Sequence, residues 1–162
     1  MKKIVNIERS IIPACDVVDL KKLREIVKST YEVDKVSAYK VGFEIGLSVG
    51  LKNAVKEIRK FTDKPIIYDH QKGGTDIPEK GEKFASVCAD AGINAIIIFP
   101  FTGPKSEDAW IDSINKQGLG LIVGAEMTHA NFLASAGGYI SDDAPKKIFS
   151  LAHLLLRQIC RY

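Results

Sequence analysis

Acidic and basic side chains suited to acid–base chemistry stand at the ends of short apolar runs in this sequence. Asp16, Lys40 and Asp69 close or follow three such runs, and Lys72 and Asp76 lie in the polar segment after Asp69. Carboxylates and ammoniums gathered in one cleft keep each other ionised, shift each other's pKa values and present a lysine as a proton donor. A fold that brings these five side chains together would hold an acid–base site built without a metal.

Each of these residues also has a purely structural interpretation. An aspartate after a strand is commonly the N-cap of the next helix, which applies to Asp16 because Asp19 and a helix start are close by. The segment 69–76 is also typical of a polar turn with two glycines. Lys40 must be paired or stand at the mouth of a cleft, because burying an unpaired ammonium is costly. The residue types alone leave both interpretations open.

The elements that must position these side chains are five apolar runs of strand length, each followed by a stretch with helical spacing. The predicted strands cover residues 11–15, 36–41, 65–68, 95–99 and 119–125. Strands that alternate with helices and are apolar on both faces indicate a parallel sheet covered by helices, so the fold class is α/β. In this class the active and binding sites lie at the carboxyl ends of the strands, which is where the charged residues are placed.

The predicted helices start near residues 20, 44, 79, 104 and 144. The second is predicted to run unbroken over residues 44–61, with Leu47, Leu51, Val55 and Ile58 as its buried stripe. The last begins with a proline in its first turn, a position that proline favours. No linker separates these helices and strands.

The size and composition are those of one ordinary globular domain. The chain has 162 residues, 46% of them hydrophobic, and is predicted to form a single domain over residues 1–162. A net charge of +3 is too small and dispersed for a nucleic-acid partner. No window has the roughly 18 uncharged apolar residues of a membrane helix, and the first residues do not form a signal peptide. Three widely spaced cysteines predict no disulfide framework or metal site, and favour the cytoplasm.

Length and spacing bear on whether the sheet closes into a barrel. The predicted strands start about 24 to 30 residues apart, which is the period of a (β/α) unit. An eight-stranded barrel needs upward of roughly 200 residues. Length alone therefore favours an open, doubly wound parallel sheet.

The sequence resembles the orotidine 5′-monophosphate decarboxylase family in its short archaeal-like form. The matching stretches are Asp16, residues 39–42, residues 65–69 leading to Lys72 and to Asp76-Ile77-Pro78, residues 91–95, and residues 126–129. The resemblance covers residues 11–152, and its most specific part is the ordered series Asp, Lys, Asp, Lys, Asp-Ile-Pro. It implies TIM-barrel (β/α) units, about five of the eight being present.

For function, the resemblance implies a homodimer that converts orotidine 5′-monophosphate (OMP) to UMP and CO₂ without metal or organic cofactor. It makes Asp69 the carboxylate held against the substrate carboxylate, and Lys72 the acid that protonates C6. Lys40 would orient Asp69 and touch the ribose. Asp16 would bind a ribose hydroxyl, and Asp76 would reach into the partner subunit's site.

The match also shows departures from the family. Thr128 takes a position near the pyrimidine edge where the family usually has serine. The usual spacing is Asp-x-Lys-x-x-Asp, whereas here two and then three residues separate Asp69, Lys72 and Asp76, so the loop must bulge. The adjacent Gly73 and Gly74 make such a bulge possible.

The family continues with three more strands, the last two carrying a glycine-rich loop and an arginine that grip the phosphate. This chain ends before them, and residues 153–162 lose the clear helical polarity of the earlier helices. We therefore interpret the sequence as a truncated or frame-shifted gene product.

Two other functions stay open at this point. One is a sister decarboxylase or aldolase acting on a sugar phosphate, of the ketogulonate-phosphate or hexulose-phosphate type, which uses Mg²⁺ held by acidic residues. The other is an open-sheet binding or assembly module, or an inactive fragment.

Overall fold

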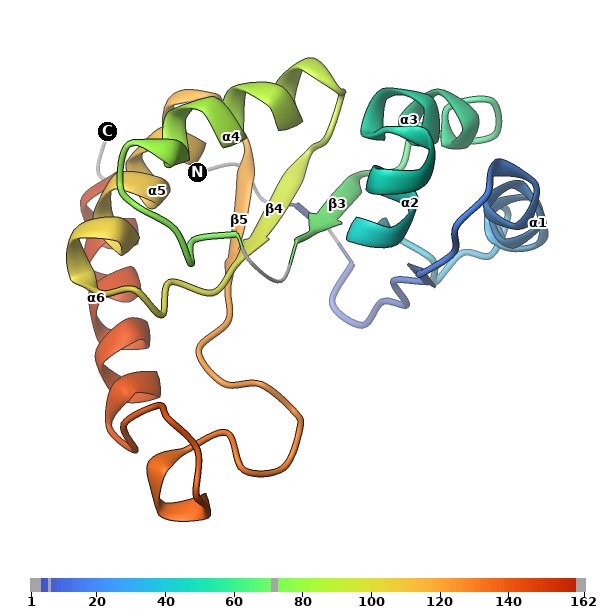
Figure 1. Ribbon diagram of the computed structural model, residues 1–162. Coiled ribbons are helices and arrows are strands. Elements are labelled where there is room, and N and C mark those ends of the chain that lie inside the picture. Colours follow the sequence, from blue (N-terminus) through green and yellow to red (C-terminus); the bar gives the residue numbers. More distant parts are fainter. Residues whose placement is uncertain (1–3, 6, 71–72, 160–162) are drawn as a thin grey trace.

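Five short parallel strands form one sheet flanked by helices (Figure 1). The computed structural model describes residues 4–5, 7–70 and 73–159. The strands are β1 (Ala14–Cys15), β2 (Tyr39–Gly42), β3 (Ile66–Asp69), β4 (Ala95–Ile98) and β5 (Gly120–Val123). All five predicted strands are thus confirmed, with ends shifted by up to a few residues. Their many isoleucines and valines suit a pleated, buried surface.

The helices follow the strands in alternation. They are α1 (Leu20–Thr30), α2 (Phe43–Val49), α3 (Leu51–Ile58), α4 (Lys80–Asp90), α5 (Pro104–Lys116) and α6 (Ala144–Ile159), with a short 3₁₀ turn, η1 (Ala134–Ala136), before α6. Neighbouring helices pack side by side, α1 on α3, α4 on α5 and α5 on α6. None of the helices in the described part of the chain has the length and apolar character needed to cross a bilayer.

The strand order decides between a barrel-type and a doubly wound sheet. The strands lie in the order β1-β2-β3-β4-β5, and each pairs in parallel with the next in sequence. A doubly wound sheet instead reverses its order at a switch point. The expectation of a doubly wound sheet, which rested on length, is therefore wrong. The fold consists of five consecutive (β/α) units of the TIM-barrel type.

The two faces of the sheet differ in what covers them. One face packs under the helices in a large apolar cluster that includes Tyr39, Val41 and Tyr68. Side chains that alternate with these point the other way, where Ala38 and Ile67 belong to a much smaller cluster. This second face is the inner one in a barrel, and it is where alternate residues of each strand are available for a site.

The predicted helix over residues 44–61 is wrong in one respect. Gly50, with φ of 81°, divides it into α2 and α3. A residue with a side chain rarely adopts this φ, so the break depends on glycine. The change of direction leaves Leu47 80% exposed, whereas Val55 and Ile58 are buried as expected.

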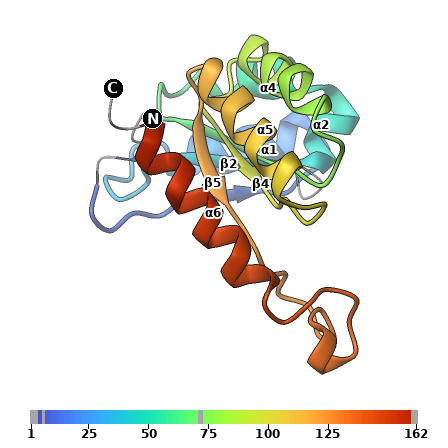
Figure 2. The same cartoon turned by 90° about the vertical axis from the view of Figure 1, so that its left-hand side faces the viewer.

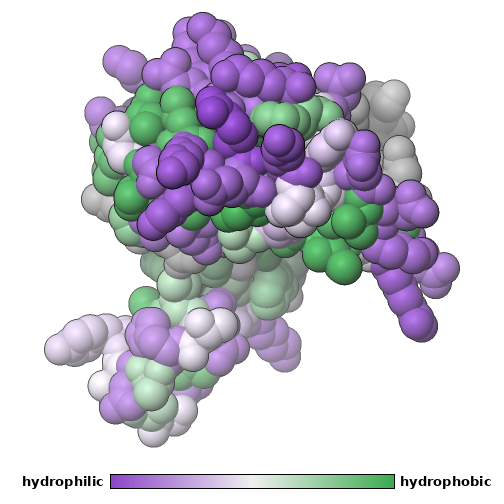
Figure 3. Space-filling model, turned by 90° about the vertical axis from the view of Figure 1, so that its right-hand side faces the viewer, coloured by the Kyte–Doolittle hydropathy of each residue, from purple (hydrophilic) through white to green (hydrophobic). Residues whose placement is uncertain are grey.

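Residues 124–143 leave the carboxyl end of β5 and project away from the body before α6 returns to pack on α5 (Figures 1 and 2). The face formed by the first helices is mainly hydrophilic, and the projection is visible below it (Figure 3). Helix α6 continues to Ile159, and Leu155 and Leu156 pack against the main core. Residues 153–159 are therefore helical, although their pattern alone did not indicate it.

Asn94 joins the starts of two central strands. Its Oδ1 accepts hydrogen bonds from the Ile66 N–H (2.8 Å) and from the Arg59 guanidinium (2.9 Å). Asn94→Ala leaves both donors short of a partner, so we expect the free energy of unfolding to fall by about 2 kcal/mol. Urea unfolding measures the change, with Gln117→Ala at an exposed amide as control. Equal midpoints for the two variants would contradict this role.

Cys15 and Cys88 are free and buried. Burial is the main reason that the pKa of each thiol is raised to about 12, so both stay protonated at neutral pH. Their positions fit the expectation of packing residues. Cys160 lies outside the described residues.

Candidate active site at the carboxyl ends of the strands

The fold brings Asp16, Lys40 and Asp69 together at the carboxyl ends of three neighbouring strands. The Lys40 ammonium lies 2.6 Å from Asp69 Oδ2 and 3.9 Å from Asp16 Oδ1. Helix α1 is capped by Asp19, whose side chain accepts the Lys22 N–H at 2.8 Å. The N-cap interpretation of Asp16 is therefore wrong, and its carboxylate faces Lys40 instead.

Strand alternation explains why these side chains share one face. Tyr39 and Val41 point into the main core, so Lys40 between them points to the inner face. Lys40 pairs in register with Ile67, two residues before Asp69, and Gly42 pairs with Asp69 itself. The long lysine side chain reaches along the strand direction to the carboxylate on the next strand.

Burial and charge act in opposite directions on Lys40. Burial by itself lowers the pKa of its ammonium, but the hydrogen bond and charge of Asp69, with smaller contributions from Asp16 and Glu44, outweigh it. The pKa of Lys40 is therefore raised, and the side chain is a fixed positive charge near pH 7 rather than a base. The Asp69 side chain is 9% exposed. Within the described residues its Oδ1 atom has no hydrogen-bond partner, so one buried acceptor is left unused.

Glu44 also belongs to this group, although its sequence position did not single it out. It stands in the first turn of α2. A Cβ atom built on Gly42 would lie 2.6 Å from Glu44 Oε2 and 2.9 Å from Asp16 Oδ1, so both carboxylates lie over this glycine. The signal in the sequence was an acidic residue two positions after a glycine that ends a strand. Acidic residues are also common in the first turn of a helix, so this signal did not indicate a site.

The Lys40–Asp69 pair is expected to matter for folding. Lys40→Met leaves a mostly buried carboxylate without its counter-charge, and we expect a loss of about 2 kcal/mol in the free energy of unfolding. Adding Asp69→Asn removes that charge and should restore part of the loss. Urea unfolding of the single and double variants measures the coupling, with Lys21→Met on the exposed face of α1 as control. A double variant no more stable than Lys40→Met would contradict it.

The hydrogen-bond register between the β3 and β4 sides changes after β3, as the two-residue excess in the spacing predicts. The Asn94 N–H donates to the Ile66 carbonyl and the Phe99 N–H donates to the Gly73 carbonyl. Asn94 and Phe99 are five positions apart on the β4 side, whereas Ile66 and Gly73 are seven positions apart on the β3 side. The β3 side therefore contains two more residues between the same two hydrogen bonds. A Cβ atom on Gly73 would lie 2.9 Å from the His70 carbonyl oxygen, and Gly74 has φ of 81°. Lys72, the predicted acid, lies outside the described residues.

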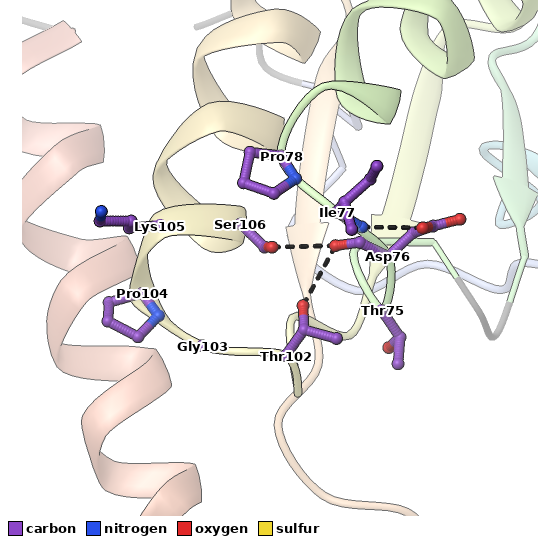
Figure 4. Close-up of a pocket in the computed structure, with 9 residues that line it drawn as sticks. All are labelled: Thr75, Asp76, Ile77, Pro78, Thr102, Gly103, Pro104, Lys105 and Ser106. Carbon is purple, nitrogen blue, oxygen red and sulfur yellow. Dashed lines mark hydrogen bonds between the residues drawn. The ribbon is translucent and has the colours of Figure 1, made fainter.

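Asp76 lies apart from the Lys40–Asp69 pair, in the turn before α4. Its carbonyl accepts hydrogen bonds from the hydroxyls of Ser106 (2.8 Å) and Thr102 (3.2 Å), and its Oδ1 accepts the Ile77 N–H (2.8 Å). Figure 4 shows the carboxylate directed away from Ser106 and Thr102. Within the described residues it forms no ion pair. The role predicted for it, in a partner subunit's site, does not require contact with Asp69 of its own chain.

A cavity of about 560 Å³ lies between this turn and the start of α5 (Figure 4). Asp76 lines it, with Thr102 and Ser106 on the facing side, but Lys40 and Asp69 do not. Thr128, the predicted pyrimidine contact, is exposed in the projecting segment after β5. The structure thus gathers Asp16, Lys40 and Asp69 into one group and places Asp76 and Thr128 outside it.

Comparisons with known proteins show which family this chain resembles. The family model described as "Orotidine 5'-phosphate decarboxylase / HUMPS family" matches residues 9–148. Orotidine 5'-phosphate decarboxylases of Methanosarcina mazei and Methanosarcina barkeri are each 34% identical over 133 residues, which is 80% of this chain and 57% of the relative. The chain thus spans little more than half the length of these curated relatives.

A solved structure shows the same fold. The crystal structure of orotidine 5'-monophosphate decarboxylase from Methanocaldococcus jannaschii is 31% identical, with a TM-score of 0.74. The match covers 91% of this chain and 67% of that structure. The consecutive (β/α) units, the match over residues 9–148 and these relatives agree, and the chain belongs to the orotidine 5'-phosphate decarboxylase / HUMPS family.

Proposed function

We propose that the protein decarboxylates orotidine 5′-monophosphate to UMP, a carbon–carbon lyase reaction of pyrimidine biosynthesis. The observation that carries the proposal is the Lys40–Asp69 pair at 2.6 Å, placed at the carboxyl ends of barrel-type strands with one Asp69 oxygen unpaired among the described residues. A partly desolvated carboxylate that an ammonium holds in place repels a negative group on the substrate. This repulsion ends when the substrate loses that group. The names of the relatives support this substrate.

In the proposed reaction the bond between C6 and the substrate carboxylate breaks. CO₂ leaves, and the electron pair stays on C6 as a carbanion. Lys72 donates a proton to that carbon, and the resulting amine is reprotonated by solvent. A cation at the reacting carbon stabilises the developing negative charge more than the ground state, which is what accelerates a reaction.

The other residues bind and orient. Lys40 holds Asp69 through their 2.6 Å hydrogen bond, so the carboxylate stands against the departing group. Placing two carboxylates side by side adds ground-state repulsion that is relieved as CO₂ leaves. Asp16 binds a ribose hydroxyl, Thr128 contacts the pyrimidine edge, and Asp76 reaches into the site of a second subunit in a homodimer.

The test is turnover by the 162-residue chain itself. Purified protein is incubated with OMP, and UMP formation is followed by ultraviolet absorbance and confirmed by chromatography. We expect UMP and CO₂ in equal amounts. Isothermal titration with UMP measures binding separately from chemistry. The absence of both turnover and UMP binding would contradict the proposal. Binding without turnover would favour the interpretation as an inactive fragment or binding module.

The sister function is a Mg²⁺-dependent reaction on a sugar phosphate. Glu44 beside Asp16 adds a carboxylate that such a site could use. However, no three His, Cys, Asp or Glu side chains in the described residues gather closely enough to hold a metal ion. The Lys40 ammonium lies instead between Asp16 and Asp69. Turnover of OMP that survives a chelator would exclude a metal requirement, and turnover of a hexulose phosphate only with Mg²⁺ would favour the sister function.

A further inference from the structure

A second cavity, of about 480 Å³, lies between the loop after β4, the projecting segment and the start of α6. Its walls are largely apolar and include Phe101, Ile140 and Ile148. Tyr139 stands at its edge, fully exposed. None of Asp16, Lys40 or Asp69 lines it, so it is separate from the proposed active site.

One carboxylate lines this apolar cavity. Glu107, in the first turn of α5, is 2% exposed because α6 packs over it. Its Oε1 atom is buried and has no hydrogen-bond partner in the described part of the chain. Burial raises the pKa of Glu107 to about 7, against a smaller lowering by the backbone of Ala152. A buried acceptor without a partner is costly, and the cost rises when the group is ionised.

We infer that this cavity binds a small organic monocation, a primary ammonium on an apolar stem, whose charged end pairs with Glu107. The ammonium supplies the counter-charge and the hydrogen-bond donors that Oε1 lacks, and a short alkyl chain fits the apolar walls. The site lies outside the chemistry proposed for this family and adds to it.

The rim of the cavity selects for a single positive charge. Lys147 lines it and is 74% exposed, with its ammonium 2.5 Å from Asp143 Oδ2. That carboxylate is already paired, so a second ammonium on the ligand would face Lys147 without a free partner. Tyr139 and Lys147 are the other titratable side chains that line the cavity among the described residues.

The probe is n-hexylammonium, titrated into the ¹⁵N-labelled chain and followed by amide chemical shifts. We expect saturable shifts centred on Ile140, Ala144 and Ile148, with a Kd in the millimolar range or below. Because Glu107 ionises around pH 7, affinity should rise about tenfold from pH 6 to pH 8 while the probe stays protonated. Uncharged 1-hexanol and doubly charged 1,6-diammoniohexane should each bind at least tenfold more weakly.

Two variants and one control variant distinguish binding at this site from nonspecific binding. Glu107→Gln should weaken hexylammonium at pH 8 by tenfold or more, whereas Asp108→Asn, at the exposed neighbouring carboxylate, should leave it unchanged. Ala144→Leu fills the cavity from the start of α6 while keeping Glu107, and should also abolish binding. No saturable shifts in the parent chain, equal binding of 1-hexanol, or undiminished binding to Glu107→Gln would each overturn the inference.

Discussion

Asp69→Asn is expected to lower the turnover of OMP by about 10³-fold while changing the affinity for UMP by less than about tenfold. The asparagine keeps the shape of the side chain but removes the charge that Lys40 holds at 2.6 Å. In the proposed reaction that charge acts on the departing carboxylate, which UMP lacks. The effect should therefore appear in kcat rather than in product binding. Steady-state kinetics and calorimetry with UMP measure the two separately.

A control variant and a second variant of the proposed site make this result specific. Asp34→Asn makes the same change at an exposed loop position and should leave kcat unaltered. Lys72→Ala, which removes the proposed proton donor, should lower kcat by roughly 10²- to 10⁴-fold. An Asp69→Asn variant with normal kcat and weakened UMP binding would show that Asp69 serves binding alone.

The second large effect concerns stability and pH. Glu107 has a pKa of about 7 in the folded chain, raised from 4.5 by burial, so the folded state binds the proton more tightly than the unfolded state. Its contribution to stability is present in full below about pH 4.5 and is lost as the pH rises through about 7. We expect the parent chain to lose about 3 kcal/mol more than Glu107→Gln between pH 4.5 and pH 8.5.

The comparison with Glu107→Gln isolates this group, because all other titrations are shared by the two proteins. Urea unfolding at several pH values gives the difference, and Asp108→Asn should follow the parent curve. At low pH the parent and Glu107→Gln should differ little, since both carry a neutral side chain. Parallel curves for parent and Glu107→Gln across the whole range would show that Glu107 is not desolvated in solution.

Local sequence determined the elements and the edge at which the charges meet. Apolar runs rich in isoleucine and valine predicted five strands, because such runs bury both faces of a sheet. Lys40 and Asp69 could be placed at the same edge from this pattern alone, since parallel strands carry their carboxyl ends together. The two-residue excess in the segment from Asp69 to Asp76 also predicted a bulge, and the hydrogen bonds on either side of it show the two-residue offset.

Tertiary structure decided what depends on partners distant in sequence. The sequential strand order follows from how each helix packs back on the sheet, and length alone pointed to a doubly wound sheet. Gly50 ends α2, although the apolar spacing of the sequence continues past it. The change of direction at Gly50 lets α3 pack against α1. Glu44 and Glu107 both read as ordinary acidic residues of a helix start. One joins Asp16 and the other is buried by α6, because packing between elements, rather than local pattern, sets the solvation of a carboxylate.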